Sequence, residues 1–210
     1  MKLDIDSIIN QIKDIFDGDS SGHDYWHTMR VYKTAKKIAN DINCNMEIVE
    51  LSALLHDVDD AKLFDTKNYE TAKNIMKKAG VDKKTIDSVV NIIGEISYKG
   101  KDSVIPKSIE GQIVQDADRL DALGAIGIAR TFAYGGSRGK DIYNPNIQPQ
   151  NEMDEIAYLE GKGSSVNHFY EKLFRLKDMM NTEIGRKIAE ERDVYMHQYL
   201  ERFMDEWRGI

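Results

Sequence analysis

Cysteine is almost absent from this chain of 210 residues, since Cys44 is the only one. A single cysteine excludes a disulfide within the chain and any zinc site built from paired cysteines, and it fits a reducing compartment. Proline is also scarce, with three residues, so long helices can run without interruption. No apolar stretch approaches the roughly 20 residues that cross a bilayer. We therefore expect a helical, cytoplasmic protein that does not bind membranes.

An excess of positive charge is missing as well. The sequence has 36 acidic and 29 basic residues, which gives a formal net charge of −7. This balance disfavours long-range attraction to nucleic acid or anionic lipid, although a local basic pocket could still hold a phosphate. We expect a small-molecule ligand and no nucleic-acid partner.

Apolar residues recur at helical spacing along most of the chain, while signals for strands are weak. This pattern predicts an all-α fold. The expected helices cover residues 5–18, 24–40, 46–56, 67–79, 82–97, 109–134, 164–180 and 182–208.

No linker divides the chain, so we predict one helical domain over residues 1–210. Its core would cover residues 20–135, and its closing helices residues 164–208. Between them, residues 135–151 contain three glycines and two prolines without any period, which predicts an extended loop. The apolar side of the last helix is consistent with a homodimer.

Histidine is rare too, and the five residues are His23, His27, His56, His168 and His197. In "LLHDVDDAK", His56 and Asp57 directly follow two leucines. Divalent metals of intermediate hardness bind imidazole nitrogens together with carboxylate oxygens. His27 from an earlier helix and an aspartate from a later one could complete a site with this pair.

The later aspartates occur in "VQDADRLDALGA", where Asp116, Asp118 and Asp121 interrupt an otherwise apolar helix. Burying such charges without partners costs roughly several kcal/mol each, so a cation would explain them. A solvated helix face is the alternative. However, Asp116 and Asp118 lie on nearly opposite sides of a helix, so at least one should point inward.

The order of these residues resembles the H…HD…D signature of the HD-domain metal-dependent phosphohydrolases. Five blocks, "GHDYWHTMRV", "ALLHDVDDAK", "DADRLDALGAIGIARTF", "GGSRG" and "NHFYEKLFRLKDMM", are similar to the small stand-alone bacterial branch of that superfamily. The resemblance covers residues 20–200. It implies an all-helical fold and hydrolysis of phosphate esters or anhydrides, and the branch includes enzymes that act on nucleoside triphosphates.

The resemblance also implies one divalent ion held by His27, His56, Asp57 and Asp118. Asp118 is preferred to Asp116 because the family's last aspartate commonly precedes an arginine. Mn²⁺ is the favoured ion, and Fe²⁺, Ni²⁺, Zn²⁺ and Mg²⁺ are alternatives. No histidine occurs between His56 and His168, which disfavours a site with two metals.

Catalysis in such a site would be in-line attack on phosphorus by a metal-activated water. Asp60, three residues after Asp57, matches the position of an acid that assists proton transfer in some relatives, and Asp59 is its rival. His23, one helical turn before His27, could bind phosphate or act as an acid. A capped turn with an exposed ion pair is an equally good interpretation of the acids that follow Asp57.

Five further residues could surround a polyphosphate, and each could instead form a structural ion pair. They are Lys62, Arg119, Arg130, His168 and Lys172. Arg119, for example, could pair with Asp121 or Asp116. The function expected from these features is metal-dependent hydrolysis of nucleotides. A nucleotide-sensing module with weak or no catalysis is the alternative.

Overall fold

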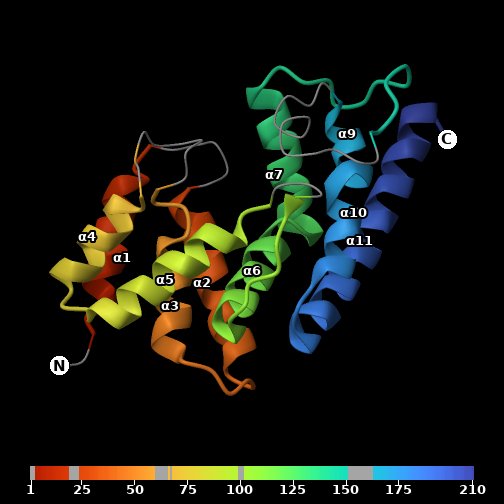
Figure 1. The fold of residues 1–210 in the computed structure, drawn as a ribbon. Coiled ribbons are helices and arrows are strands. Elements are labelled where there is room, and N and C mark those ends of the chain that lie inside the picture. The colour runs from red at the N-terminus through yellow and green to blue at the C-terminus, as the bar shows by residue number, and fades with distance from the viewer. Residues whose placement is uncertain (1–2, 19–23, 60–65, 67, 99–101, 151–162) are drawn as a thin grey trace. The chain divides into compact units, whose positions relative to one another are not determined.

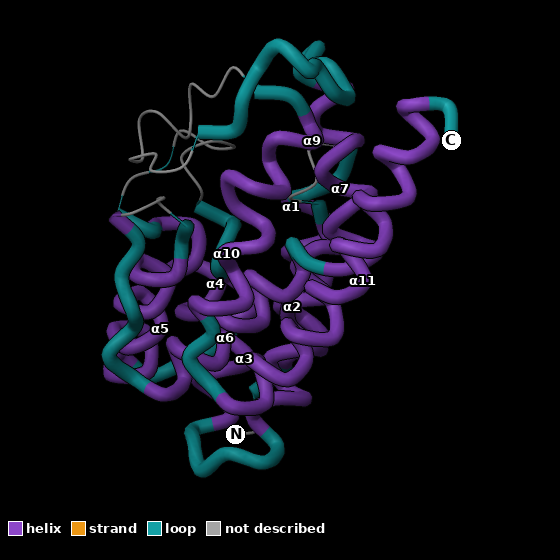
Figure 2. The backbone as a smooth tube through the Cα atoms, turned by 90° about the vertical axis from the view of Figure 1, so that its right-hand side faces the viewer, coloured by secondary structure: helices purple, strands orange, loops and turns teal. Residues whose placement is uncertain are grey.

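The computed structural model describes residues 3–18, 24–59, 66, 68–98, 102–150 and 163–210, and these residues form helices and loops without any strand (Figures 1 and 2). The predicted all-α fold class is therefore confirmed. The chain divides into two compact units. The first contains Met1–Ser97 and Val104–Ala117, and the second contains Tyr98–Ser103 and Asp118–Ile210. The organisation of residues 1–210 as one domain stays a prediction.

In the described part of the first unit, five helices and the greater part of a sixth are present. They are α1 (Ile5–Ile15), α2 (Tyr25–Ala39), α3 (Met46–Leu55), α4 (Glu70–Lys78), α5 (Lys83–Ile96) and α6 (Ile109–Asp121). Helix α3 packs against α2, α5 and α1, and its residues from Leu51 to Leu55 are fully buried. A stretch of consecutive residues that is buried on all sides, as here in the second half of α3, lies inside a core. The chain therefore carries His56, the next residue, directly into the interior.

Polar side chains fix the ends of these helices. Asp24 caps α2, and its carboxylate accepts a hydrogen bond of 2.7 Å from the backbone N–H of His27. Asn45 caps α3 in the same way. Gln115, which is fully buried in α6, donates from its side-chain amide to the carbonyl of Val104 at 2.9 Å. The two caps determine where α2 and α3 begin. The Gln115 contact attaches α6 to the segment that precedes it.

The predicted helix over residues 109–134 is wrong, because two helices occupy this stretch. Helix α6 ends at Asp121, and α7 (Gly124–Ser137) begins after a short corner. Gly124 has a φ of +70°, a conformation that side chains strongly disfavour. A Cβ atom on Gly127 would lie 2.1 Å from the carbonyl oxygen of Ala122, so the corner is too tight for any side chain there. Both glycines were visible in the sequence as signals of this break.

The second unit contains α7 and the C-terminal helices. The predicted helix over residues 164–180 is a succession of short segments: α9 (Ser165–His168), the π-helix η2 (Phe169–Leu173), α10 (Phe174–Leu176) and the 3₁₀ helix η3 (Lys177–Met179). The long helix α11 (Glu183–Arg208) follows and packs against α7 and η3.

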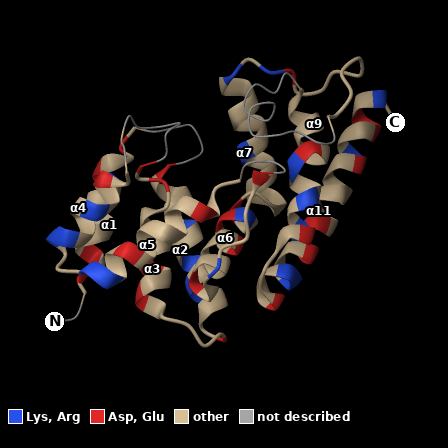
Figure 3. Ribbon diagram, viewed as in Figure 1, with Lys and Arg blue, Asp and Glu red and all other residues tan. Residues whose placement is uncertain are grey.

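An aromatic cluster forms the core of this unit. Phe132 of α7 lies 6.0 Å from Phe169 and 6.1 Å from both Tyr199 and Phe203, measured between ring centroids. The exposed side of α11 carries interspersed acidic and basic residues (Figure 3), some joined in ion pairs such as Lys187 with Glu183. No helix among the described residues is both long enough and apolar enough to cross a membrane.

Candidate metal centre

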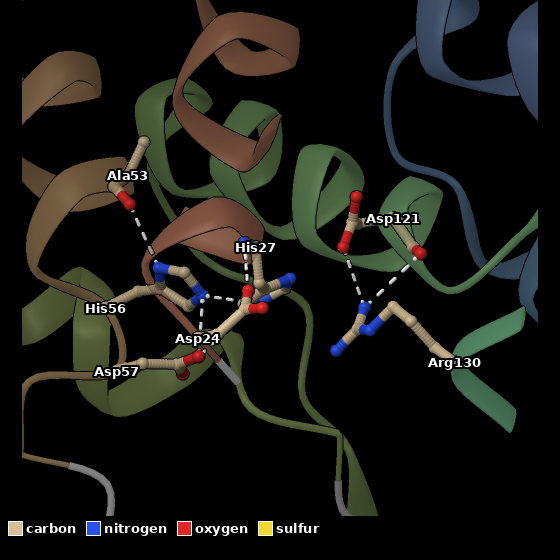
Figure 4. A network of polar contacts seen from close by, with 7 residues as sticks. All are labelled: Asp24, His27, Ala53, His56, Asp57, Asp121 and Arg130. Carbon is tan, nitrogen blue, oxygen red and sulfur yellow. Dashed lines mark hydrogen bonds and ion pairs between the residues drawn. The ribbon is translucent and has the colours of Figure 1, made fainter. Parts of the chain in front are cut away.

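Two buried histidines from different helices meet in the first unit. His27 lies in the first turn of α2, and His56 is the C-cap residue that follows α3. Their Nε2 atoms are 3.1 Å apart, and the two rings meet edge to face (Figure 4). Two nitrogens that bind one ion at about 2.1 Å and at a right angle would lie about 3.0 Å apart. The observed spacing therefore suits a shared ion.

The hydrogen bond on the other side of the His56 ring defines its tautomer. Nδ1 lies 2.9 Å from the carbonyl oxygen of Ala53 (Figure 4). Because a carbonyl can only accept, Nδ1 must carry the proton, and the Nε2 lone pair of the neutral ring is available to a metal. This partner could not be predicted from the sequence, since a backbone carbonyl leaves no side-chain signal.

Asp57 joins the two histidines. Its Oδ2 atom lies 3.3 Å from Nε2 of His27 and 3.2 Å from Nε2 of His56. Adjacent side chains can converge here because α3 ends at Leu55 and the chain continues as a turn. The end of the helix thus explains why the neighbouring residues His56 and Asp57 can face the same point.

Asp118 completes a group of possible ligands. It lies in the last turn of α6. The preceding part of this unbroken helix, up to Ala117, belongs to the first unit. One potential ligand atom from each of His27, His56 and Asp118 lies within 4.8 Å of the others. Asp116 is completely buried and is not part of this group among the described residues.

The donor set fits a divalent transition metal. Imidazole nitrogen and carboxylate oxygen suit Mn²⁺, Fe²⁺, Ni²⁺ and Zn²⁺, and two neutral rings with two carboxylates can neutralise a double positive charge. Buried carboxylates need compensation of this kind, and Asp57 is a buried residue.

Comparison with known proteins identifies this arrangement. The family model of the HD domain matches residues 25–123, which include all four predicted ligands. The chain is also 39% identical to YpgQ of Bacillus subtilis over 203 residues, covering 95% of this chain and 91% of YpgQ. The chain belongs to the HD-domain family. HD domains bind divalent metals, so the group formed by His27, His56 and Asp118 is the expected metal centre.

Solved structures support the same HD assignment over nearly the whole chain. A protein from Lactobacillus plantarum has a TM-score of 0.89 at 34% identity, covering 100% of this chain and 99% of the other. An HD-superfamily hydrolase from Bacillus thuringiensis has a TM-score of 0.77 at 41% identity, with 98% and 97% covered. YpgQ in complex with ADP has a TM-score of 0.78 at 36% identity, with 96% and 97% covered. The fold is that of an HD-superfamily hydrolase.

Asp59 of this HD domain has a structural contact. Its two carboxylate oxygens accept hydrogen bonds from the backbone N–H groups of Thr71 at 3.1 Å and Ala72 at 2.8 Å. These amides lie in the first turn of α4, where Tyr69 has a positive φ and supplies no side-chain cap. Asp59 therefore caps α4 from a distant part of the chain, while its catalytic role stays a prediction.

Replacing Asp59 by alanine is expected to lower the free energy of unfolding by about 0.5–2 kcal/mol, as loss of a helix cap does. Chemical denaturation without metal measures this change. Asp59→Asn keeps one acceptor oxygen and should lose less. The control is Asp87→Ala, at an exposed position on α5. Equal stabilities for Asp59→Ala and the control would contradict the capping role.

Three predicted residues, His23, Asp60 and Lys62, lie outside the described part of the chain. The two arginines of the predicted substrate site have structural partners. Arg119 donates to the carbonyl of Met179, and Arg130 forms an ion pair of 2.8 Å with the Asp121 carboxylate. The ion pair between Arg119 and an aspartate that the sequence suggested stays a prediction.

His168 and Lys172 lie in the second unit beside a second lysine. Burial lowers the pKa of His168 to about 3, and the positive charges of Lys172 and Lys140 act in the same direction. His168 is therefore neutral at physiological pH. The ammonium group of Lys172 lies 4.7 Å from the centre of the Tyr98 ring, within range of a cation–π interaction. Two positive charges thus lie near one neutral imidazole.

The low pKa of His168 predicts a loss of stability in acid. Between pH 6.5 and 3 the unfolded chain binds a proton at this residue that the folded chain does not, so the free energy of unfolding falls as the pH falls. One such group contributes at most about 1.4 kcal/mol per pH unit. Urea unfolding at pH 7, 6 and 5 should therefore show a smaller loss for His168→Asn than for the wild type. Identical losses would show that His168 does not titrate in this way.

Proposed function

We propose that this HD-domain protein hydrolyses the phosphoanhydride bonds of nucleoside triphosphates, with Mn²⁺ as the favoured ion. The observation that carries the proposal is the convergence of His27, His56 and Asp118 around one point, with Asp57 beside both rings. The ADP complex of YpgQ supports a nucleotide as the ligand class. A cytoplasmic location and a homodimer belong to the same proposal.

Metal binding and proton transfer are assigned to different residues. His27, His56, Asp57 and Asp118 would hold the ion, which when bound supplies a Lewis acid and a water of lowered pKa. The Nδ1–H of His56 keeps its ring oriented through Ala53. Because both oxygens of Asp59 accept backbone amides, we assign proton transfer to Asp60, with His23 as a further candidate acid.

Substrate phosphates would be bound by cationic and hydrogen-bonding side chains. Lys172 offers a positive charge and neutral His168 a ring N–H. Lys62 is a further proposed phosphate ligand. Arg119 and Arg130 already bind protein groups, so any contact that they make with phosphate would be additional to those structural partners.

The test is turnover of a nucleotide panel by the purified protein with added Mn²⁺. We expect release of phosphate or pyrophosphate, identified by ³¹P NMR, and loss of that release after treatment with a chelator. The panel should contain ribo- and deoxyribonucleotides of all bases. Nucleotide binding by calorimetry without any hydrolysis would refute the catalytic proposal in favour of a sensing module.

A further inference from the structure

The C-terminal end of α6 holds the metal ligand Asp118. This helix ends at Asp121, so Asp118 lies in its last turn. The last four carbonyls of a helix have no partner within the helix, and terminal turns fray unless other groups bind them. At this end the backbone N–H groups of Ala122 and Leu123 donate to the carbonyls of Arg119 and Leu120 at 3.1 and 3.0 Å, and each carbonyl oxygen can accept a second hydrogen bond. The position of Asp118 therefore depends on what binds the carbonyl groups at this end.

Arg192 of α11 binds one of these carbonyls. Its guanidinium Nη1 donates to the backbone oxygen of Leu120, two residues after Asp118. The stem of Arg192 passes over the corner between α6 and α7, where a Cβ atom on Gly124 would lie 3.0 Å from Cγ of Arg192. The glycine thus makes room for the arginine, and no sequence pattern indicates this contact across 72 positions.

Two further arginines act at the same end. Arg130 donates to the backbone oxygen of Asp121 at 3.3 Å and to its carboxylate at 2.8 Å. Arg119 connects α6 to η3 through the carbonyl of Met179. Positive groups at a helix C-terminus also interact favourably with the helix dipole. Of the three, Arg192 comes from the element most distant in sequence and binds the carbonyl nearest to Asp118.

We propose that Arg192 is a positioning residue for the metal centre: by binding the carbonyl of Leu120, it holds the last turn of α6 so that Asp118 reaches the ion. This inference rests on the proposed metal centre. It assigns to α11, which lies outside the residues matched by the HD model, a direct part in forming the site.

The test compares Mn²⁺ affinity, measured by competition with a chelator, among the wild type and three variants. Arg192→Met keeps an unbranched stem over Gly124 but removes the donor, whereas Arg192→Lys keeps a charge and a donor. Arg202→Met is the control, because Arg202 lies on the same helix and pairs only with exposed Glu206 among the described contacts. We expect Arg192→Met to weaken Mn²⁺ binding by roughly 10- to 100-fold, as loss of groups that orient ligands does. Arg192→Lys should recover part of the affinity, and Arg202→Met should bind as the wild type does.

Hydrogen exchange of the metal-free proteins separates positioning from general stability. The amides near the end of α6, from Asp118 to Leu123, should exchange faster in Arg192→Met, while those of α3 keep wild-type rates. Unchanged Mn²⁺ affinity in Arg192→Met would overturn the inference and leave the metal centre intact. A wild-type protein that binds no Mn²⁺ would overturn both. If Arg192→Met does not fold, Arg192→Lys decides: reduced Mn²⁺ affinity together with faster exchange at the end of α6 would support the inference, and wild-type affinity and exchange would overturn it.

Discussion

Replacing His56 by alanine is expected to abolish metal-dependent hydrolysis. The variant loses a nitrogen that lies 3.1 Å from His27 Nε2 and 3.2 Å from the Asp57 carboxylate. Loss of groups that merely orient ligands lowers metal affinity or activity about 10- to 100-fold, and loss of the ligand itself should have a larger effect. Mn²⁺ binding and nucleotide turnover should both be measured, because the proposal requires that they fall together.

His197→Ala provides the matched control for this experiment. His197 lies on α11 with 58% of its side chain exposed, and it contacts Asp193 at 3.7 Å. Removing it tests whether loss of any histidine weakens metal binding. We expect wild-type Mn²⁺ affinity in this variant. Retention of both ion and activity in His56→Ala would refute the assignment of the metal centre.

Of the variants proposed for this protein, Phe169→Ala is expected to show the largest decrease in the free energy of unfolding. The Phe169 side chain is completely buried and lies 6.0 Å from the Phe132 ring, 5.9 Å from Phe174 and 6.3 Å from Tyr199. Truncation of a buried phenylalanine costs about 3–5 kcal/mol, because it removes apolar contacts and leaves a cavity. Chemical denaturation should show this decrease in the free energy of unfolding.

Tyr170→Ala is the neighbouring control, since Tyr170 is 44% exposed. It lies in the same π-helix as Phe169, so a difference between the two variants reports burial and not the type of helix. Similar losses for both would show that the aromatic cluster does not form the core of the second unit. Phe169→Leu, which preserves much of the volume, should fall between alanine and the wild type.

The sequence predicted the helical class because apolar spacing is a local signal, whereas the grouping of His27, His56 and Asp118 was implied by the resemblance to the HD family. Apolar spacing reports which face of a helix is buried, and a histidine placed directly after the buried C-terminal half of α3 enters the core. The match to a family order then related helices far apart in the chain. The same resemblance implied Asp57, and the structure shows that the end of α3 lets His56 and Asp57 face one point.

The remaining features depend on contacts between distant residues. The cap that Asp59 provides for α4 joins residues 12 and 13 positions apart, and the contact of Arg192 with Leu120 spans 72. No local pattern distinguishes an arginine that binds a carbonyl from one that binds phosphate. The break between α6 and α7 is different, because Gly124 and Gly127 mark it in the sequence, although the apolar period continues across them.

Helix α6 is held at two levels, by Gln115 through the carbonyl of Val104 and by Arg192 through the carbonyl of Leu120. Each residue added to a helix turns everything after it by about 100°. A single insertion between Gln115 and Asp118 would therefore rotate the carboxylate away from the two imidazoles while leaving every ligand type in the chain. The number of residues between these anchors is thus as much a requirement of the site as the ligands, and a relative with an altered count could retain the HD motif without the ability to bind the ion.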